Sequence, residues 1–319
     1  MYELLQHRLH ISVIADLKQI FGNLGHTIHD VCMSNHAFVF NRYRNATDVI
    51  NHENWTSLDK EMCDSFYNRY KDRLSGYDGF ICTYPPAFSL LYEKFNKPII
   101  IQCPIRYEVP FQNDLTKLKW LNEYLKSGID NSQIILAANN SYDKRYLEES
   151  LDRECLLIPS HCDYTGINYV GGTNWLYSSM SKLEINHPNI KNKREYLGEC
   201  YKWNKLNEIK GIIEVPYNIS TMSIFEYYTS NIPLVFPTPE FNLELYRKGL
   251  SLQNLSWTAT NRDTLDWIKL SDCYGDWMPY ITYFDSFEEL YTVLDKIDTQ
   301  DISEKMKRFN VLRKDRIYS

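Results

Sequence analysis

The stretch "GIIEVPYNISTMSIFEYYTSNIPLVFP", residues 211–237, alternates strand-like and helix-like segments and decides the predicted fold. Its first apolar run ends at Pro216, and small hydroxyl and amide residues lead into a run with helical spacing from about residue 221. The closing "IPLVFP" is short, apolar and bounded by prolines, which is typical of a buried strand. A strand, a turn, a helix and a second strand form one βαβ unit, so this segment predicts a parallel sheet.

The same alternation runs along the first half of the chain. It predicts strands over 9–16, 27–34 (with a continuation over 36–41), 77–84, 99–105, 133–140 and 155–160. It predicts helices over 17–26 with a stop at Gly25, 56–74 with a Ser/Thr-type cap, 87–95, 114–128 closed by Gly128, and 142–151. The strands are apolar throughout rather than alternating, so helices should cover both faces of their sheet.

The second half of the chain is less regular. A Gly-rich polar stretch over 160–179 has few helix formers, so we expect it to be an interdomain connection or an irregular first strand. After it we expect helices over 192–206, from 221, over 240–249 and over 286–297, and strands over 211–216 and 232–237.

The length of the chain bears on its domain organisation. At 319 residues it exceeds the usual size of one hydrophobic core, so two domains of roughly 150 residues are expected. We predict an α/β protein with two Rossmann-like domains that face each other across a cleft. The predicted boundaries are 1–158, 159–300 and a helical tail over 301–319 that can pack back on the first domain.

Composition and charge argue against several classes of protein. The formal net charge of -6 provides no basic field that would gather nucleic-acid phosphates. No run approaches the roughly 20 apolar residues that span a bilayer, and the first residues lack the pattern of a signal peptide. The eight cysteines are scattered without a CxxC pair, which favours reduced, buried thiols in a cytoplasmic protein.

The helix that starts near residue 221 is a candidate anion site. Such a helix start carries about half a positive charge and unsatisfied N–H donors, which suit a phosphate or diphosphate. Ser220, Thr221 and Ser223 could add hydroxyl donors, or they could simply cap their own helix. Glu226 could be the capping-box partner of Ser223, or its carboxylate could accept hydrogen bonds from two ribose hydroxyls.

The segment 211–237 resembles the donor-binding segment of glycosyltransferases with the GT-B fold. "TSNIPLVFP" stands where that family has a "G-x-P-hydrophobic-hydrophobic" strand, after a helix that carries an acidic residue. The N-terminal half, with "ADLKQIF", "SNHAFVFN", "IRYEVPF" and "AANNSYD", is similar to glycosyltransferase-like proteins of large DNA viruses. The resemblance implies that the second domain holds a nucleotide sugar and that the first holds the acceptor and a base.

Two departures from the family pattern bear on the mechanism. Many retaining members carry two glutamates eight positions apart, whereas the position eight before Glu226 is Asn218. A Gly-rich donor loop is also missing from the sequence. The departures favour an inverting mechanism and leave the usual phosphate contacts unassigned.

The resemblance implies a set of donor-binding residues around the helix start, together with two basic residues upstream. They are Tyr217, Asn218, Ser220, Thr221, Met222, Ser223, Glu226, Arg194 and Lys202. Arg194 and Lys202 would neutralise the leaving diphosphate, or they are solvated residues of a helix surface.

Candidate residues for the acceptor side lie in the first domain. Asp16 is the first candidate base, because the predicted strand over 9–16 ends on it, although it could equally cap the next helix. His36, with His26 as an alternative, is the second candidate, and either could be structural. Arg106 and Glu108 could bind the acceptor, or they could form an ion pair that fixes their loop.

The leading hypothesis is an inverting glycosyltransferase that moves a sugar from a nucleotide-diphosphate sugar, such as a UDP sugar, to a hydroxyl of a glycan or small acceptor. The alternative is a two-domain sugar- or nucleotide-binding protein without transferase activity, either epimerase-like or a binding module. The resemblance implies a site that works without a metal or other cofactor, and the absence of an Asp-x-Asp triplet from the sequence agrees with that. The expected compartment is the cytoplasm, or the host cytoplasm for a viral protein, and the oligomeric state stays open.

Overall fold

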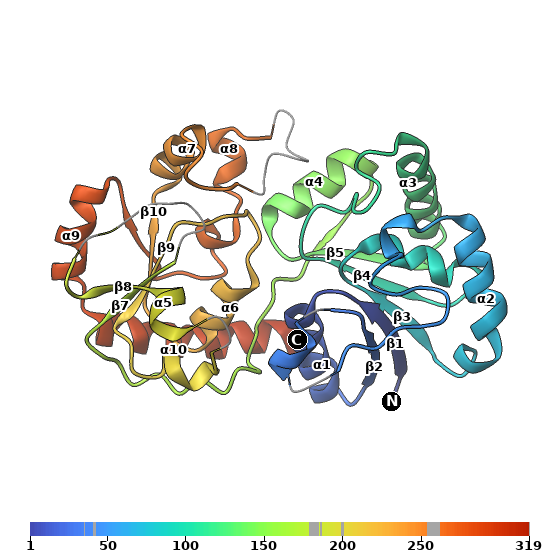
Figure 1. Cartoon of the computed structure of the whole chain (residues 1–319), viewed down its shortest axis with the longest axis horizontal. Helices are drawn as coiled ribbons and strands as arrows, with labels where there is room; N and C mark the ends of the chain where they lie inside the picture. The colour runs from blue at the N-terminus through green and yellow to red at the C-terminus, as the bar shows by residue number, and fades with distance from the viewer. Residues whose placement is uncertain are drawn as a thin grey trace. The chain divides into compact units, whose positions relative to one another are not determined.

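The protein is described from a computed structural model, which covers residues 1–34, 36–40, 43–178, 185, 187–198, 201–253 and 262–318. The chain divides into two compact units, unit 1 (Met1–Pro159) and unit 2 (Ser160–Ser319). Each unit is built on a parallel sheet with helical connections (Figure 1), which confirms the predicted fold class of two Rossmann-like α/β domains. Their predicted arrangement across a cleft stays a prediction.

The sheet of unit 1 has the order β2-β1-β3-β4-β5-β6, and each described pairing in it is parallel. Its strands are β1 (Glu3–Arg8), β2 (Thr27–Cys32), β3 (Gly79–Cys82), β4 (Ile99–Cys103), β5 (Ile134–Ala138) and β6 (Leu156–Leu157). Every residue of the inner strand β3 is buried, as its unbroken apolar sequence predicts for a sheet with both faces covered.

Helices connect these strands along the chain. They are α1 (Ile11–Asn23), η1 (Ala37–Phe40), η2 (Trp55–Ser57), α2 (Lys60–Leu74), η3 (Pro86–Phe95), α3 (Leu115–Asp130) and α4 (Ser141–Leu151). Right-handed crossovers place α1 on one face of the sheet and the connections after β2 on the other. Contacts of η3 with α2 and α3, and of α3 with α4, agree with that arrangement.

The strand predicted over 9–16 is wrong. The first strand ends at Arg8, and residues 11–23 form α1, with Val13, Leu17 and Ile20 buried along one face. The β-branched residues of "HISVIAD" suggested a strand, but their apolar positions also fit the helical period, and burial beside β2 selects the helix. Asp16 therefore lies within α1 rather than at the end of a strand.

Smaller corrections in unit 1 concern the ends of helices. The cap of α2 is Asp59, whose carboxylate accepts a hydrogen bond from the backbone N–H of Met62, so the predicted Ser/Thr-type cap is wrong. Gly128 lies inside α3, which continues to Asp130, so the prediction that it closes the helix is wrong. A glycine is needed there because a Cβ would collide with the side chain of Ile134 of β5. The predicted strand continuation over 36–41 is a 3-10 turn, η1, as far as it lies within the described residues.

The sheet of unit 2 has the order β11-β10-β9-β7-β8, and each described pairing is again parallel. Its strands are β7 (Trp175–Ser178), β8 (Ile190–Asn192), β9 (Gly211–Glu214), β10 (Leu234–Pro237) and β11 (Thr282–Phe284). The connecting helices are α5 (Lys193–Leu197), η4 (Trp203–Leu206), α6 (Met222–Thr229), α7 (Pro239–Arg247), α8 (Leu265–Ile268), η5 (Asp272–Tyr274) and α9 (Phe287–Lys296). Buried residues of α7 and α9 share one core cluster with β9, β10 and β11.

Unit 2 also differs from the prediction in places. The helix predicted over 192–206 is wrong, because residues 190–192 form β8 and the helical part consists of the short α5 and η4, with residues 199–200 outside the described part. The N-terminal cap of α6 is Thr221 rather than Ser223, so Ser223 and Glu226 do not form a capping box. Strand β7 lies inside the stretch predicted as a connection or irregular first strand.

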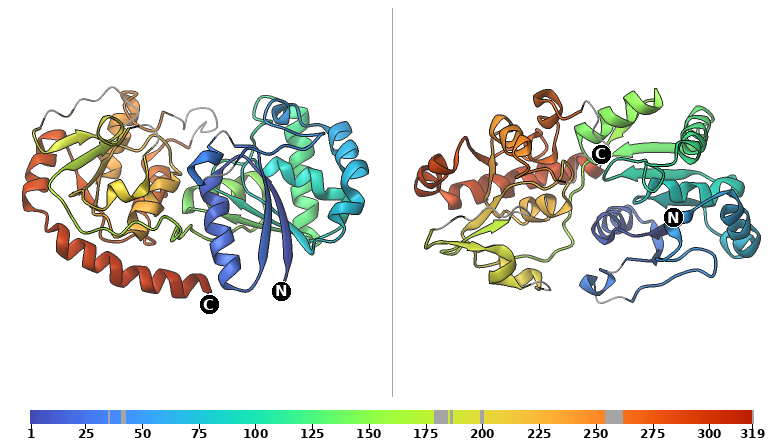
Figure 2. Two further views of the ribbon diagram at one scale, coloured as in Figure 1. Left: turned by 60° about the horizontal axis from the view of Figure 1, so that its bottom comes forward. Right: turned by 45° about the horizontal axis from the view of Figure 1, so that its top comes forward.

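The predicted C-terminal tail is the helix α10 (Thr299–Tyr318), the long helix that ends the chain in Figure 2. Asn310 donates hydrogen bonds to the carbonyls of Tyr228 (3.0 Å) and Thr229 (3.3 Å) at the end of α6. Arg313 is fully buried and donates to Thr229 Oγ1 (2.9 Å) and to the carbonyl of Ser160 (3.1 Å). These contacts attach α10 to unit 2, and its predicted packing on the first domain stays a prediction.

Candidate functional site

Both sheets reverse the direction of chain progression next to their first strand. In unit 1 the chain moves from β1 to one side and continues from β3 to the other, and in unit 2 the same happens between β7 and β9. At such a reversal the connecting loops diverge beyond the carboxyl ends of the strands, and ligands of open α/β sheets bind there. Functional residues are therefore expected at these two strand pairs, one in each unit.

In unit 1 the loops after β1 and β3 meet directly. The backbone N–H of Leu9 donates to the carbonyl of Tyr84 (3.2 Å), and Gln6 Nε2 donates to Thr83 Oγ1 (2.6 Å). We call these two segments, residues 8–10 at the end of β1 and residues 83–84 after β3, the β1–β3 edge.

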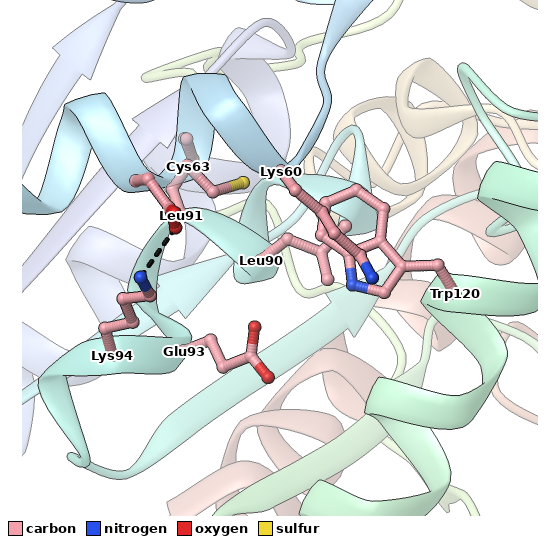
Figure 3. A pocket seen from close by; sticks show the side chains of 8 residues that line it. Lys60, Cys63, Leu90, Leu91, Glu93, Lys94 and Trp120 are labelled. Carbon is pink, nitrogen blue, oxygen red and sulfur yellow. Dashed lines mark ion pairs between the residues drawn. The ribbon is translucent and has the colours of Figure 1, made fainter.

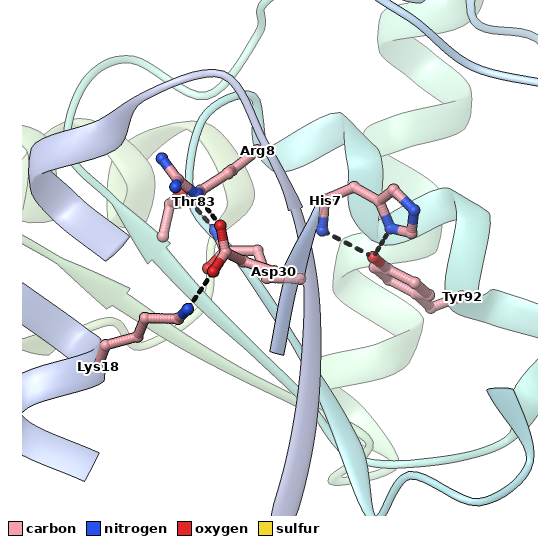
Figure 4. A network of polar contacts seen from close by, with 7 residues as sticks. His7, Arg8, Lys18, Asp30, Thr83 and Tyr92 are labelled. Atoms are coloured by element: carbon pink, nitrogen blue, oxygen red, sulfur yellow. Dashed lines mark hydrogen bonds and ion pairs between the residues drawn. The ribbon is translucent and has the colours of Figure 1, made fainter. Parts of the chain in front are cut away.

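A buried ion pair anchors the last residue of β1 (Figure 4). Arg8 Nε donates to Asp30 Oδ2 at 2.7 Å, and Lys18 of α1 contacts the other carboxylate oxygen. Burial by itself raises the pKa of Asp30, but the attraction of Arg8 and Lys18 outweighs it and lowers that pKa below its ordinary value. Among the described residues, Arg8 Nη1 has no hydrogen-bond partner, so one side of a buried guanidinium stays available at the β1–β3 edge.

A second buried contact lies on the other side of β1 in Figure 4. Tyr92 Oη accepts a hydrogen bond from the backbone N–H of His7 (3.1 Å) and lies 2.5 Å from His7 Nδ1. Burial, with a smaller contribution from the charge of Arg73, lowers the pKa of His7 to about 3. This histidine is neutral in the folded protein, and its contacts fix β1 against η3.

His10 is the residue of unit 1 that the sequence analysis missed. It is the N-terminal cap position of α1, directly after β1, and among the described residues its Nδ1 has no hydrogen-bond partner. Burial, followed by the charges of His36 and Arg8, lowers the pKa of His10 to about 4. The imidazole is therefore neutral near pH 7 and able to accept a proton. The sequence carried no clear signal for His10, because it fell inside the strand that was wrongly predicted over 9–16 rather than two residues after β1.

The predicted catalytic residues have different outcomes. Asp16 is buried in α1 at 3% exposure, so the geometric reason for choosing it as the base is lost. His36 is exposed, and its backbone N–H donates to Ser34 Oγ (3.1 Å). Its effect on the pKa of His10 places it near the β1–β3 edge. His26 instead accepts a hydrogen bond from the N–H of Tyr2 and lies at the opposite end of the strands.

Arg106 and Glu108 follow β4 and are both buried. Arg106 Nη1 lies 3.5 Å from Asp143 Oδ1 of α4, and both side chains are at most 1% exposed. Glu108 accepts a hydrogen bond from Tyr146 of the same helix, and burial raises the pKa of Glu108 above its ordinary value. These contacts favour the interpretation in which both residues fix their loop, and acceptor binding by them stays a prediction.

In unit 2 the loop after β9 is tied to two later segments. The N–H of Leu252 donates to the carbonyl of Pro216 (2.8 Å), and the N–H of Asp272 donates to the carbonyl of Ile219 (3.2 Å). Most importantly, the N–H of Thr221 donates to the carboxylate of Asp272 at 2.6 Å. The start of α6 therefore already faces a carboxylate of the protein, which balances the positive end of the helix dipole.

The other predicted donor residues are distributed along this loop and helix. Asn218 and Thr221 are buried, and Asn218 Oδ1 accepts the N–H of Ile219 (2.8 Å). Tyr217, Ser220 and Ser223 are half-buried, whereas Met222 is buried at 8% exposure. Glu226 is equally buried, and one of its carboxylate oxygens accepts a hydrogen bond of 2.5 Å from Tyr164. Arg194 and Lys202 are exposed.

Two charged residues of unit 2 that the sequence analysis missed lie at strand ends. Glu214, the last residue of β9, is 2% exposed, and among the described residues its Oε2 has no hydrogen-bond partner. Burial raises the pKa of Glu214, partly offset by the charge of Lys193. Lys193 directly follows β8, and its Nζ donates to Tyr227 Oη of α6 at 2.8 Å. We call Lys193, Glu214 and the loop 215–221 the β9 edge.

Hollows on the surface of unit 1 lie elsewhere. One, of about 240 Å³, lies between α2 and η3 and is closed on one side by Trp120 of α3 (Figure 3). Its charges include Lys94 and Asp64, which form an ion pair at 2.6 Å, and Glu93 and Lys60. Charges of both signs balance there, and the described lining includes no residue of the β1–β3 edge.

The described residues contain no group of three or more His, Cys, Asp or Glu side chains that could hold a metal ion. The predicted independence from metal and other cofactors stays a prediction. Seven of the cysteines are buried and belong to no disulfide, and Cys200 lies outside the described residues. No described helix has the length and apolar character that crossing a bilayer requires.

Several solved structures align with most of the chain at low identity. The glycosyltransferase SnogD from Streptomyces nogalater aligns with 12% identity and a TM-score of 0.49, over 98% of this chain and 95% of its own. The spinosyn forosaminyltransferase SpnP aligns with 12% identity and a TM-score of 0.48, over 97% and 94%. MnaA of S. aureus, in a structure with UDP, aligns with 12% identity and a TM-score of 0.44, over 86% and 93%.

These TM-scores are below 0.5, so we infer neither activity nor ligand from the alignments. No protein-family model matches the sequence, and no curated protein matches it. None of the three names refers to a virus, and the predicted similarity to viral proteins stays a prediction.

The buried ion pair predicts a stability change. Asp30→Asn should lower the free energy of unfolding by about 3 kcal/mol, because it leaves the buried charge of Arg8 without its counter-charge. The control is Asp130→Asn, which breaks the more exposed pair with Arg153 (2.6 Å) and should change stability little. Urea denaturation of the three proteins at pH 7 measures the difference.

The same pair predicts a pH dependence. The pKa of Asp30 is lower in the folded chain than the ordinary value that it has in the unfolded chain. The stabilisation by the pair is therefore complete above that value and is lost as pH falls through the lower, folded pKa. If the urea measurements at pH 7 gave equal losses of unfolding free energy for Asp30→Asn and Asp130→Asn, the Arg8–Asp30 pair would not anchor β1.

Proposed function

We propose that the protein is a glycosyltransferase that moves a sugar from a nucleotide-diphosphate sugar to a hydroxyl of a glycan or small acceptor. The observation that carries the proposal is the pair of strand-end sites. Each unit has, where its sheet reverses direction, an ionisable side chain with a buried atom that has no partner among the described residues: Nδ1 of the half-buried His10 in unit 1 and Oε2 of the buried Glu214 in unit 2. Buried polar atoms without partners are costly, and a bound substrate would satisfy them.

The donor would bind at the β9 edge. Glu226, one carboxylate oxygen of which accepts a hydrogen bond from Tyr164, would also accept hydrogen bonds from ribose hydroxyls. The ammonium of Lys193, which acts on both Glu214 and Tyr217, would offset the charge of the diphosphate. This assignment moves the cationic role from the exposed Arg194 and Lys202 to a half-buried lysine at a strand end.

The acceptor would bind at the β1–β3 edge, with His10 as the base. Neutral His10 would take the proton of the acceptor hydroxyl while its oxygen attacks the anomeric carbon. The bond from that carbon to the diphosphate breaks, and the nucleoside diphosphate leaves with the electron pair. A single displacement of this kind inverts the configuration at the anomeric carbon. Arg8, at the end of the same strand, would hold the acceptor in line.

One observation favours the alternative of a sugar-binding or epimerase-like protein without transferase activity. The carboxylate of Asp272 already occupies the start of α6, which was the expected seat of the diphosphate. A diphosphate there would meet a like charge unless Asp272 moved or took up a proton. The tests below separate the two functions.

Nucleotide binding is the first test. At a concentration of about 100 times its dissociation constant, the cognate ligand among UDP, TDP and GDP should stabilise the fold by about 2.7 kcal/mol. The expected result of a thermal-melting panel is therefore a rise in melting temperature by several degrees with one nucleoside diphosphate. A rise with free sugars and with none of the nucleotides would favour the binding-module alternative.

The role of His10 gives a separate prediction. His10→Gln should lower the transfer rate by at least about 100-fold, because glutamine cannot take the acceptor proton. The melting response to the nucleotide should stay unchanged, since His10 lies in unit 1. His52→Gln, on a surface loop of the same unit, is the matched control and should keep full activity. Transfer undiminished in His10→Gln would exclude this residue as the base.

A further inference from the structure

A second hollow of unit 1 lies beside its edge strand β2. It has a volume of about 630 Å³, and its lining includes Arg44, Arg69, Arg73, Asp48 and Tyr70, with Val31 of β2 at its base. We call it the arginine hollow. Asn45, Ala46 and Thr47 complete its described lining.

Hydrogen bonds fix the walls of the arginine hollow. The N–H of Asn45 donates to the carbonyl of Cys32 at 2.6 Å, which ties the loop to the end of β2. On the other side, the N–H of Asp48 donates to Tyr70 Oη at 3.0 Å, which ties the loop to α2. The hollow is therefore a built concavity between a strand edge and a helix.

The charges in the arginine hollow are unbalanced. Arg69 Nη2 and Nε both donate to Asp48 Oδ2, at 2.8 and 3.2 Å. Among the described lining residues Asp48 is the one carboxylate, against the guanidinium groups of Arg44, Arg69 and Arg73. The whole chain has a net charge of -6, so this concentration of positive charge departs from the rest of the surface.

Two of the three arginines extend into the hollow from one face of α2. Arg69 and Arg73 are four residues apart on α2, so their side chains extend from the same face of the helix. The positive charge of Arg73 also reaches inward, where it contributes to the low pKa of His7. A concave surface with an excess of one sign of charge focuses the field and concentrates counter-ions.

We propose that the arginine hollow binds a phosphate or sulfate group, either as a free anion or carried on a larger ligand such as a sulfated or phosphorylated saccharide. Guanidinium groups present planar pairs of N–H donors that match the oxygens of such groups. Tyr70 Oη accepts the Asp48 N–H and can donate its own proton to the anion. The exposed Arg69–Asp48 pair, at 64% and 70% exposure, is weak enough for Arg69 to be shared with a ligand.

The proposal is tested on the full chain without any sugar donor, by calorimetric titration at low ionic strength. Inorganic sulfate is the probe for a free anion. A sulfated disaccharide and the same disaccharide without sulfate are the probes for a carried group. The expected result is binding of at least one sulfate-bearing probe, no binding of the unsulfated disaccharide, and weakening of the binding by added salt.

Two variants should shift the affinity in opposite directions. Arg73→Gln removes a positive charge and should weaken binding by about fivefold or more, whereas Asp48→Asn removes the competing carboxylate and should tighten it by a similar factor. All of the side chains involved are exposed, so both variants should fold. Arg145→Gln is the matched control, because Arg145 is also an exposed arginine with a carboxylate partner, Glu149, at 2.9 Å.

The proposal is contradicted if neither sulfate-bearing probe binds. It is also contradicted if Asp48→Asn fails to tighten the binding, or if Arg145→Gln weakens it as much as Arg73→Gln does. Failure here would leave the nucleotide-dependent rise in melting temperature untouched, because the probes and the variants do not involve the β9 edge.

Discussion

The parallel order of the two sheets is the constraint on which the rest of the structure depends. Both follow the pattern in which the second strand lies on one side of the first and all later strands on the other. Every loop that leaves a strand end therefore meets its neighbours at one edge, and the loops diverge where the direction of progression reverses. His10 and Glu214 lie at strand ends that border those two places.

Ionisable side chains are buried at these edges in pairs, which limits their energetic cost. Arg8 with Asp30, and Arg106 with Asp143, keep opposite charges together. The carboxylate of Asp272 likewise places a negative charge beside the positive start of α6, where it accepts the N–H of Thr221. Truncating one member of such a pair would leave the other charge buried without a counter-charge, which is costly, so each pair favours the arrangement in which both members are in place.

The sequence predicted the fold class, because apolar runs alternating with helical periods are local signals. It failed where several structures share one local pattern: "HISVIAD" fits a strand and a helix, and contact with β2 decides for α1. His10 was missed for that reason. Asp272 and Tyr164 lie 51 and 62 residues from their partners Thr221 and Glu226, so a local reading of residues 215–226 could not reveal these contacts. Long-range pairing therefore set the limits of the sequence analysis.

The central claim is that a nucleoside diphosphate binds at the carboxyl end of β9 in unit 2. Hydrogen–deuterium exchange of the full chain, with and without the nucleotide that raises its melting temperature, tests it most directly. Slower exchange is expected in peptides that cover Gly211–Thr229 and Lys193–Leu197, with unit 1 unchanged. Slower exchange confined to unit 1, or unchanged exchange across β9 and α6 at saturating nucleotide, would contradict the claim.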